Sequence, residues 1–195
     1  LRTDKSSPFY NRATQEVTAP GSTFKLVTAT AGVMENKISI YDTITCTGKF
    51  DLVEKDNPIN CWIYSAADGW GSHGPETLET AIRDSCNFYF NTVGYYLGQN
   101  ENGEYVGDMT LLNKYAEMYG FDSTSGIEIS EMDPQIATAD PTRAAMGQSN
   151  NAFTTSQLAR YVTTLANSGT CYDLTLLDKI TDASGNTQEE PDPVV

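Results

Sequence analysis

The apolar residues of this chain recur mainly at helical spacing. In the segment 22–35 they fall three or four residues apart, which is the period of a helix with one buried face. The same period returns in 75–84, 88–98, 109–120 and 154–168. The pattern therefore predicts five helices joined by irregular connections.

Residues at the ends of these segments support the same helices. Pro75 suits the first turn of its helix, and Thr154 or Thr155 is a natural N-cap for the last one. Gly120 and Gly169 stand where a left-handed residue commonly ends a helix. Both ends of the last helix are thus marked in the sequence.

Strand patterns are few. "LTLLDKITD" at 174–182 reads as a strand that enters the turn "ASGN", and "ITCTGKF" at 44–50 reads as a shorter strand. The chain contains no internal repeat. These patterns predict a mainly α chain of the α+β class.

Composition and charge exclude several classes of function. The 195 residues, 39% of them hydrophobic, suffice for one domain with a substantial core or for two small ones. With 12 basic and 26 acidic residues the formal charge is -14, which excludes nucleic acid as a partner. No run of about 20 apolar residues occurs. The opening "LRTDKSSPFY" lacks a signal-peptide pattern and a methionine, so we expect an excised piece of a longer protein.

A serine and a lysine stand three residues apart at the start of the first predicted helix. Residues at this spacing share a helix face, so the Ser22 hydroxyl and the Lys25 amine are expected to touch. A lysine whose pKa is lowered by burial can take the serine proton, and the N–H groups of the helix start favour a developing oxyanion. Taken alone, the pair is also explained as an N-cap serine beside a snorkelling lysine.

The segment "RDSCNFYF" offers a second wall for such a site. Ser85 and Asn87 lie at the joint of two predicted helices, where a bend can aim both side chains into a cleft. A second hydroxyl can relay a proton, and an amide can hold a substrate peptide group. The alternative makes Ser85 a helix C-terminal residue and Asn87 the N-cap of the next helix.

Together, "PGSTFK" and "SCN" resemble the first two motifs of the penicillin-binding transpeptidases and the related serine β-lactamases. "NRATQ", "SHGPETLETAIRDSCNFYF" and "AAMGQSNNAFTTSQLARYVTTLANSG" look like stretches of the class B enzymes of the elongation type. This resemblance covers about residues 11–180.

The resemblance implies a peptidoglycan D,D-transpeptidase on the extracytoplasmic face of the bacterial membrane. Ser22 would be the nucleophile that D-Ala-D-Ala stem peptides acylate and β-lactams block. Lys25 would be its general base, Ser85 the proton relay and Asn87 a substrate ligand. Partners from the cell-wall elongation machinery are expected, and catalysis needs no cofactor. The rival functions are a β-lactamase or D,D-carboxypeptidase, and a β-lactam-sensing or scaffolding domain.

The third motif of the family, Lys-Thr/Ser-Gly, has no counterpart in the sequence. The resemblance therefore implies that 1–195 is one partial transpeptidase domain, the helical subdomain of the serine β-lactamase and penicillin-binding-protein fold, with most of the central antiparallel sheet absent. Without the third motif the substrate carboxylate loses its anchor and the oxyanion one N–H donor. We expect this chain alone to be feeble or inactive.

Three cysteines and the single histidine form a second constellation. Cys46, Cys61, His73 and Cys86 are thiolate and imidazole ligands of the kind that zinc prefers, although their spacing fits no common finger. The resemblance adds that some elongation-type class B enzymes hold a metal at the matching positions, which implies a structural zinc. A Cys46–Cys61 disulfide and free thiols remain alternatives. Cys171 is left over in each case.

Overall fold

The structure, a computed structural model, describes residues 4–66 and 68–195, and its chain divides into two compact units. The single partial domain expected from the sequence stays a prediction. The terminal unit consists of Leu1–Thr18, Glu117–Gln135 and Ala152–Val195, and the central unit consists of Ala19–Ala116 and Ile136–Asn151.

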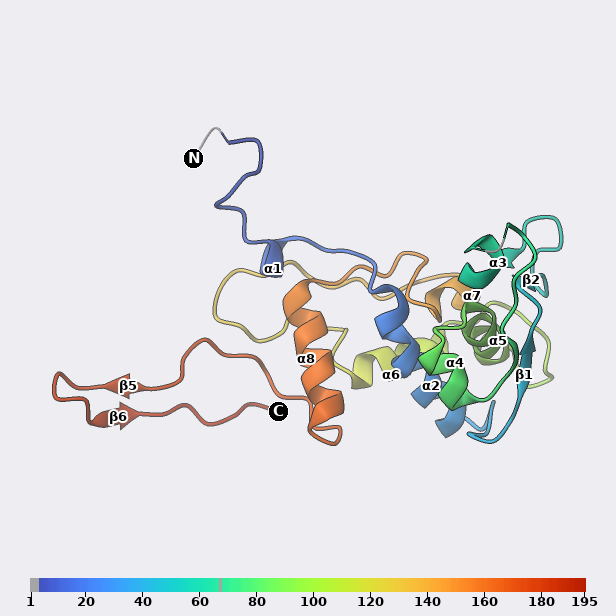
Figure 1. Cartoon of the computed structure of the whole chain (residues 1–195). Coiled ribbons are helices and arrows are strands. Elements are labelled where there is room, and N and C mark those ends of the chain that lie inside the picture. The colour runs from blue at the N-terminus through green and yellow to red at the C-terminus, as the bar shows by residue number, and fades with distance from the viewer. Residues whose placement is uncertain (1–3, 67) are drawn as a thin grey trace. The chain divides into compact units, whose positions relative to one another are not determined.

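The central unit is built around helix α5, Asn87–Leu97, which packs against α2 and α7 (Figure 1). Its side chains Tyr89, Phe90 and Val93 are fully buried. Gly94 permits the close approach of α7, because a Cβ there would lie 2.4 Å from the carbonyl oxygen of Pro141. The other helices of this unit are η1 (Gly21–Phe24), α2 (Lys25–Met34), α3 (Trp62–Ala66), α4 (Leu78–Arg83), α7 (Pro141–Ala144) and α6 (Thr110–Met118), whose last turn passes into the terminal unit.

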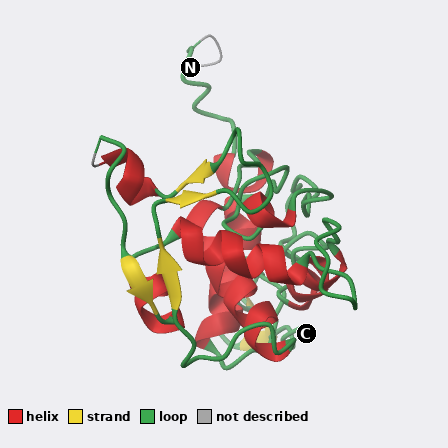
Figure 2. Cartoon of the chain, turned by 90° about the vertical axis from the view of Figure 1, so that its right-hand side faces the viewer, coloured by secondary structure: helices red, strands yellow, loops and turns green. Residues whose placement is uncertain are grey.

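The strands of the central unit are short and pair in twos. Strand β1 (Ile44–Cys46) pairs antiparallel with β4 (Gly74–Glu76), and β2 (Lys49–Phe50) pairs with β3 (Ile59–Asn60). The predicted strand 44–50 is therefore two strands. They are interrupted at Gly48, whose φ of +91° is left-handed and leaves the extended region. Figure 2 shows how small a share of the chain is strand.

One predicted helix boundary is wrong. Pro75 does not open a helix, because it lies in β4 opposite Thr45. Helix α4 begins at Leu78, after Thr77 has formed a reciprocal capping box with Thr80. The capping pair thus fixes the helix start two residues beyond the β4 strand.

The terminal unit contains α8, Thr155–Ala166, with Thr154 as its N-cap, and an aromatic core. Buried Arg160 donates to the carbonyl oxygens of Gly120 and Ser123, and this ties α8 to the segment that follows α6. The predicted strand 174–182 is wrong over 174–179, where only loop is found. The remaining elements of this unit are α1 (Arg12–Gln15), β5 (Ile180–Thr181) and β6 (Thr187–Glu189).

The predicted helices 22–35, 88–98, 109–120 and 154–168 are confirmed within two residues at most ends, although the first turn of 22–35 is a 3₁₀ helix. Gly120 and Gly169 both have positive φ, as predicted for residues that end helices. Within the described residues, no helix combines the length and the apolar character that crossing a bilayer requires.

Candidate active site

Ser22 lies on the first turn of the 3₁₀ helix η1, directly after Gly21. Its side chain is exposed, whereas Lys25, the first residue of α2, is 2% exposed. Gly21 has a φ of +57°, and its N–H donates to the carbonyl oxygen of Gly147 at 3.0 Å. A left-handed residue and one long-range hydrogen bond therefore set the start of the serine turn.

Ser22, Lys25, Ser85 and Asn87 form one hydrogen-bonded group. The Lys25 ammonium donates to Ser85 Oγ at 3.0 Å, to the Ser85 carbonyl oxygen at 2.8 Å and to Asn87 Oδ1 at 2.7 Å. Ser85 Oγ donates to Ser22 Oγ at 2.9 Å. The structure thus brings together all four residues that the sequence singles out for catalysis and substrate binding.

The expected direct contact between Ser22 and Lys25 is replaced by a bridge. The three N–H donors of Lys25 are all used by Ser85 and Asn87, so the described residues give Ser22 a link to the amine only through Ser85 Oγ. A proton that leaves Ser22 can reach Lys25 by two short transfers.

Burial tunes Lys25 for proton transfer. Loss of solvent lowers the pKa of Lys25 to about 8, against a smaller opposing electrostatic effect of Cys61 and Cys86. Lys25 forms no ion pair with any described residue, and its Nζ lies 5.5 Å from the centre of the Phe90 ring. With that pKa, roughly a tenth of the lysine is neutral at pH 7.

The left-handed backbone of Ser85 determines the geometry of the second wall of the site. Ser85 has a φ of +51°, which costs a non-glycine residue roughly 1–2 kcal/mol. This turn between α4 and α5 aims both the carbonyl oxygen and the hydroxyl of Ser85 at Lys25. Asn87 is the first residue of α5, and its N-cap is Cys86, whose Sγ accepts from the Tyr89 N–H at 3.4 Å. The predicted alternative of an Asn87 N-cap is thus wrong.

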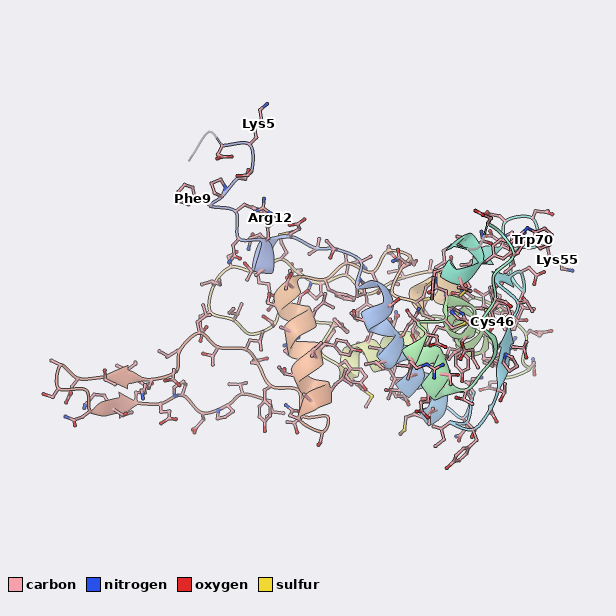
Figure 3. The ribbon with its side chains drawn as sticks, viewed as in Figure 1. Lys5, Phe9, Arg12, Cys46, Lys55 and Trp70 are labelled. Carbon is pink, nitrogen blue, oxygen red and sulfur yellow. The ribbon has the colours of Figure 1, made fainter. Side chains whose placement is uncertain are left out.

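Cys46, Cys61, His73 and Cys86 meet in the same unit. Their ligand atoms all lie within 4.8 Å of one another, and the three cysteines are at most 1% exposed. Cys46, labelled in Figure 3, ends strand β1. All the cysteines are free thiols in the structure, so it contains no Cys46–Cys61 disulfide.

The cluster has the chemistry of a metal site. Zn–S bonds of about 2.3 Å place tetrahedral ligand atoms roughly 3.7 Å apart, which is compatible with four ligand atoms that all lie within 4.8 Å of one another. His73 turns its Nδ1 toward Cys61 Sγ, 3.5 Å away. The hydrogen bond from Cys86 lowers the pKa of the Cys61 thiol, whereas the same hydrogen bond raises the pKa of Cys86 and burial raises that of Cys46. A bound metal ion deprotonates the thiols that ligate it. The residues present therefore fit a zinc ion.

Sequence reasoning missed the part played by Gly147. The sequence singles out Gly147 only as one residue of the stretch "AAMGQSNNAFTTSQLARYVTTLANSG", yet its carbonyl oxygen accepts a hydrogen bond from the N–H of Gly21, the residue before Ser22. The signal that could have found it is a glycine in the turn that follows α7, three residues after the end of the helix; Gly147 has a φ of +78°.

Comparison with known proteins identifies the relatives of this chain. The family model described as "Penicillin binding protein transpeptidase domain" matches residues 2–195. The peptidoglycan D,D-transpeptidase MrdA of Haemophilus influenzae is 28% identical over 209 residues, which are 98% of this chain and 29% of that protein. The chain thus spans less than a third of the length of this relative.

Two solved structures show the same fold. PBP2 of Pseudomonas aeruginosa is 23% identical, with a TM-score of 0.79 over 100% of this chain and 43% of that one. The ceftriaxone acyl-enzyme of penicillin-binding protein A from M. tuberculosis is 22% identical, with a TM-score of 0.77 over 99% of this chain and 41% of that one. The predicted fold, a helix-rich part of a transpeptidase domain, is confirmed.

Proposed function

Because the chain belongs to the penicillin-binding protein transpeptidase family, we propose that it carries the nucleophile wall of a site that cross-links peptidoglycan by serine acyl transfer. The observation that supports this most directly is the series of hydrogen bonds from buried Lys25 through Ser85 Oγ to Ser22 Oγ. An exposed serine joined to a lysine with a lowered pKa is the arrangement that nucleophilic catalysis needs.

In the first half-reaction Ser22 Oγ attacks the carbonyl carbon of the penultimate D-alanine of a stem peptide. With Lys25 neutral, Ser22 donates to Ser85 Oγ and Ser85 donates to Lys25 Nζ, the reverse of the directions found for the ammonium form. The Ser22 proton then passes to Ser85 Oγ while the Ser85 proton passes to Lys25. When the tetrahedral intermediate collapses, the same path returns a proton to the leaving amine of the terminal D-alanine. The product is an ester on Ser22.

In the second half-reaction the amine of a neighbouring stem peptide attacks this ester. Lys25 accepts its proton through Ser85, and the proton then returns to Ser22 as the oxygen leaves. A β-lactam, which mimics the D-Ala-D-Ala end, would stop after the first half-reaction because its ester persists. Asn87 offers its Nδ2 hydrogens to substrate, since its Oδ1 already accepts from Lys25.

The setting that we propose follows from the same family. Stem peptides are made accessible on the extracytoplasmic face of the membrane, so the site would face outward there. Proteins of cell-wall elongation would be its partners, as expected from the elongation-type motifs. The likeness to the Haemophilus peptidoglycan D,D-transpeptidase supports a role at the cell wall.

The proposed function is tested by incubating the full-length protein with a labelled penicillin and sequencing the labelled peptide by mass spectrometry. We expect one stable adduct, on Ser22, and cross-linked product from stem peptides in its absence. Rapid release of the label would indicate a β-lactamase, and stable label without cross-linking a sensor. Absence of label would contradict the nucleophile itself and leave a scaffolding domain.

We further propose that Cys46, Cys61, His73 and Cys86 hold a structural zinc. The compact donor set and the burial of its three thiols support this. Zinc would join the ends of β1 and β3, the start of β4 and the N-terminus of α5 by metal–ligand bonds, and would take no part in proton transfer.

Metal analysis of the purified full-length protein tests this second proposal. We expect one zinc per chain, and a melting temperature that falls by about 10 °C or more when a strong chelator removes it, because structural zinc contributes several kcal/mol of folding free energy. Cys61→Ser should lose the metal. Cys171→Ser is the matched control and should keep it, since Cys171 lies outside the cluster. A metal-free wild type of unchanged stability would contradict the zinc site.

A further inference from the structure

The backbone of Gly147 touches the backbone of the residue that precedes Ser22. Besides the hydrogen bond from the Gly21 N–H to the Gly147 carbonyl oxygen, Gly147 lies so close that a Cβ on it would be 2.0 Å from the Gly21 oxygen and 2.7 Å from the Gly21 carbon. Atoms at such distances cannot coexist, so only glycine permits this contact. Gly147 is buried, and its φ of +78° also favours glycine.

The segment around Gly147 is fixed to the helices of the same unit. Upstream, α7 lies against α5 at Gly94, and the Thr28 hydroxyl of α2 donates to the Ala145 carbonyl oxygen at 2.7 Å. Downstream, the buried Asn151 side chain donates to the Gln148 carbonyl oxygen at 3.1 Å. Gly147 therefore lies between two hydrogen-bonded residues, and its backbone can fix the position of the turn that carries Ser22.

The position of the Gly147 backbone determines where Ser22 Oγ lies. Gly21 is the first residue of η1, so a shift or rotation of its peptide group moves Ser22 directly. Lys25 and Ser85 are held to each other by separate hydrogen bonds that do not involve Gly147. A displaced turn would thus lengthen the 2.9 Å bond between Ser22 and Ser85 and leave the base and the relay in place.

We propose that Gly147 is a positioning residue for the nucleophile: through its contact with Gly21 it holds Ser22 Oγ at hydrogen-bonding distance from Ser85. This inference rests on the proposed function and deepens it. Gly147 touches neither substrate nor any reacting atom, and its effect is entirely on the geometry of the serine.

The test is the rate of acylation by a labelled penicillin in the full-length Gly147→Ala variant. The added methyl forces the Gly21 peptide to move by about 1 Å, and a misplacement of that size costs about 100-fold in rate. We expect the rate constant to fall about 30- to 100-fold while one label per chain is still reached at long times. The pH midpoint of the rate should stay unchanged, because Lys25 keeps its surroundings.

Gly103→Ala is the matched control. Gly103 has a φ of +79°, but no atom lies within 4 Å of a Cβ built there, so alanine brings the same backbone strain without a collision. Its rate should stay within about twofold of wild type. A wild-type rate in Gly147→Ala would overturn the inference, as would a loss of label stoichiometry that accounts for the whole effect, since that would be misfolding.

A measurement on the wild-type protein tests the contact between Gly147 and Gly21 even if the Gly147→Ala variant fails to fold. The Gly21 amide should exchange with solvent more slowly than the same amide in an unstructured peptide, because it donates to Gly147. Unprotected exchange in the folded wild type would overturn the contact. If the wild type takes no penicillin at Ser22, the proposed function fails instead, and the role of Gly147 fails with it.

Discussion

Replacing Lys25 by methionine is expected to slow acylation of Ser22 by a labelled penicillin about 1000-fold in the full-length protein. Methionine keeps the length and the burial of the side chain but has no nitrogen to accept the proton that Ser85 relays. The hydroxyls of Ser22 and Ser85 would remain in contact without a base at the end of the path. The rate constant of label incorporation, measured on protein of confirmed folding, checks this result.

The pH dependence of the acylation rate of the wild type is an independent test of Lys25 as the base. Lys25 works as a base only when neutral, and its pKa of about 8 lies well below that of an exposed lysine because it is buried. The acylation rate should therefore rise about tenfold per pH unit below 8 and level off above it. Lys25→Arg is the control that keeps a charge but cannot deprotonate, and it should be as slow as Lys25→Met. A rate that is flat between pH 6 and 9 would contradict Lys25 as the base.

The sequence predicts this site well where the geometry is local. A serine and a lysine three residues apart on a helix share a face, so spacing alone could assign Ser22 and Lys25 to one site, although the direct contact that it predicts is not the one found. What spacing could not predict is the bridge. It depends on the left-handed backbone of Ser85 and on three acceptors that take every donor of Lys25, and both are properties of the folded chain.

The helices and strands are likewise predictable where local sequence determines them, and not where pairing between distant segments does. Helices with a clear period and good caps, such as α5 and α8, could be predicted because their patterns span three or more turns. The errors fall where pairing with a distant strand decides. Pro75 pairs with Thr45, and 174–179 lacks a partner strand among the described residues, so neither follows from local pattern.

The cluster of three cysteines and one histidine falls between these cases. The sequence supplies the right residue types in Cys46, Cys61, His73 and Cys86, but no spacing rule brings them together. Two strand pairings and the N-cap of α5 do so. Cys86 stands between Ser85 and Asn87, so the second wall of the proposed catalytic site and the cluster share one turn of backbone.

Replacing Ser85 by glycine is expected to slow acylation about 100- to 1000-fold, because it removes the hydroxyl through which Ser22 reaches Lys25. Glycine suits this substitution, since the φ of +51° is a conformation that glycine adopts freely. The backbone carbonyl oxygen of residue 85 can still accept from Lys25. The variant therefore separates the loss of the relay from a loss of local structure.

Ser85→Ala is the companion variant, with the hydroxyl removed but the left-handed strain kept. It should acylate as slowly as Ser85→Gly and unfold with about 1 kcal/mol less stability than Ser85→Gly, as measured by chemical denaturation. Because the two variants differ in backbone strain and share the missing hydroxyl, equal rates assign the defect to the relay. If Ser85→Gly took the label as fast as wild type, Lys25 would have to reach Ser22 directly, as their spacing in the sequence alone suggests.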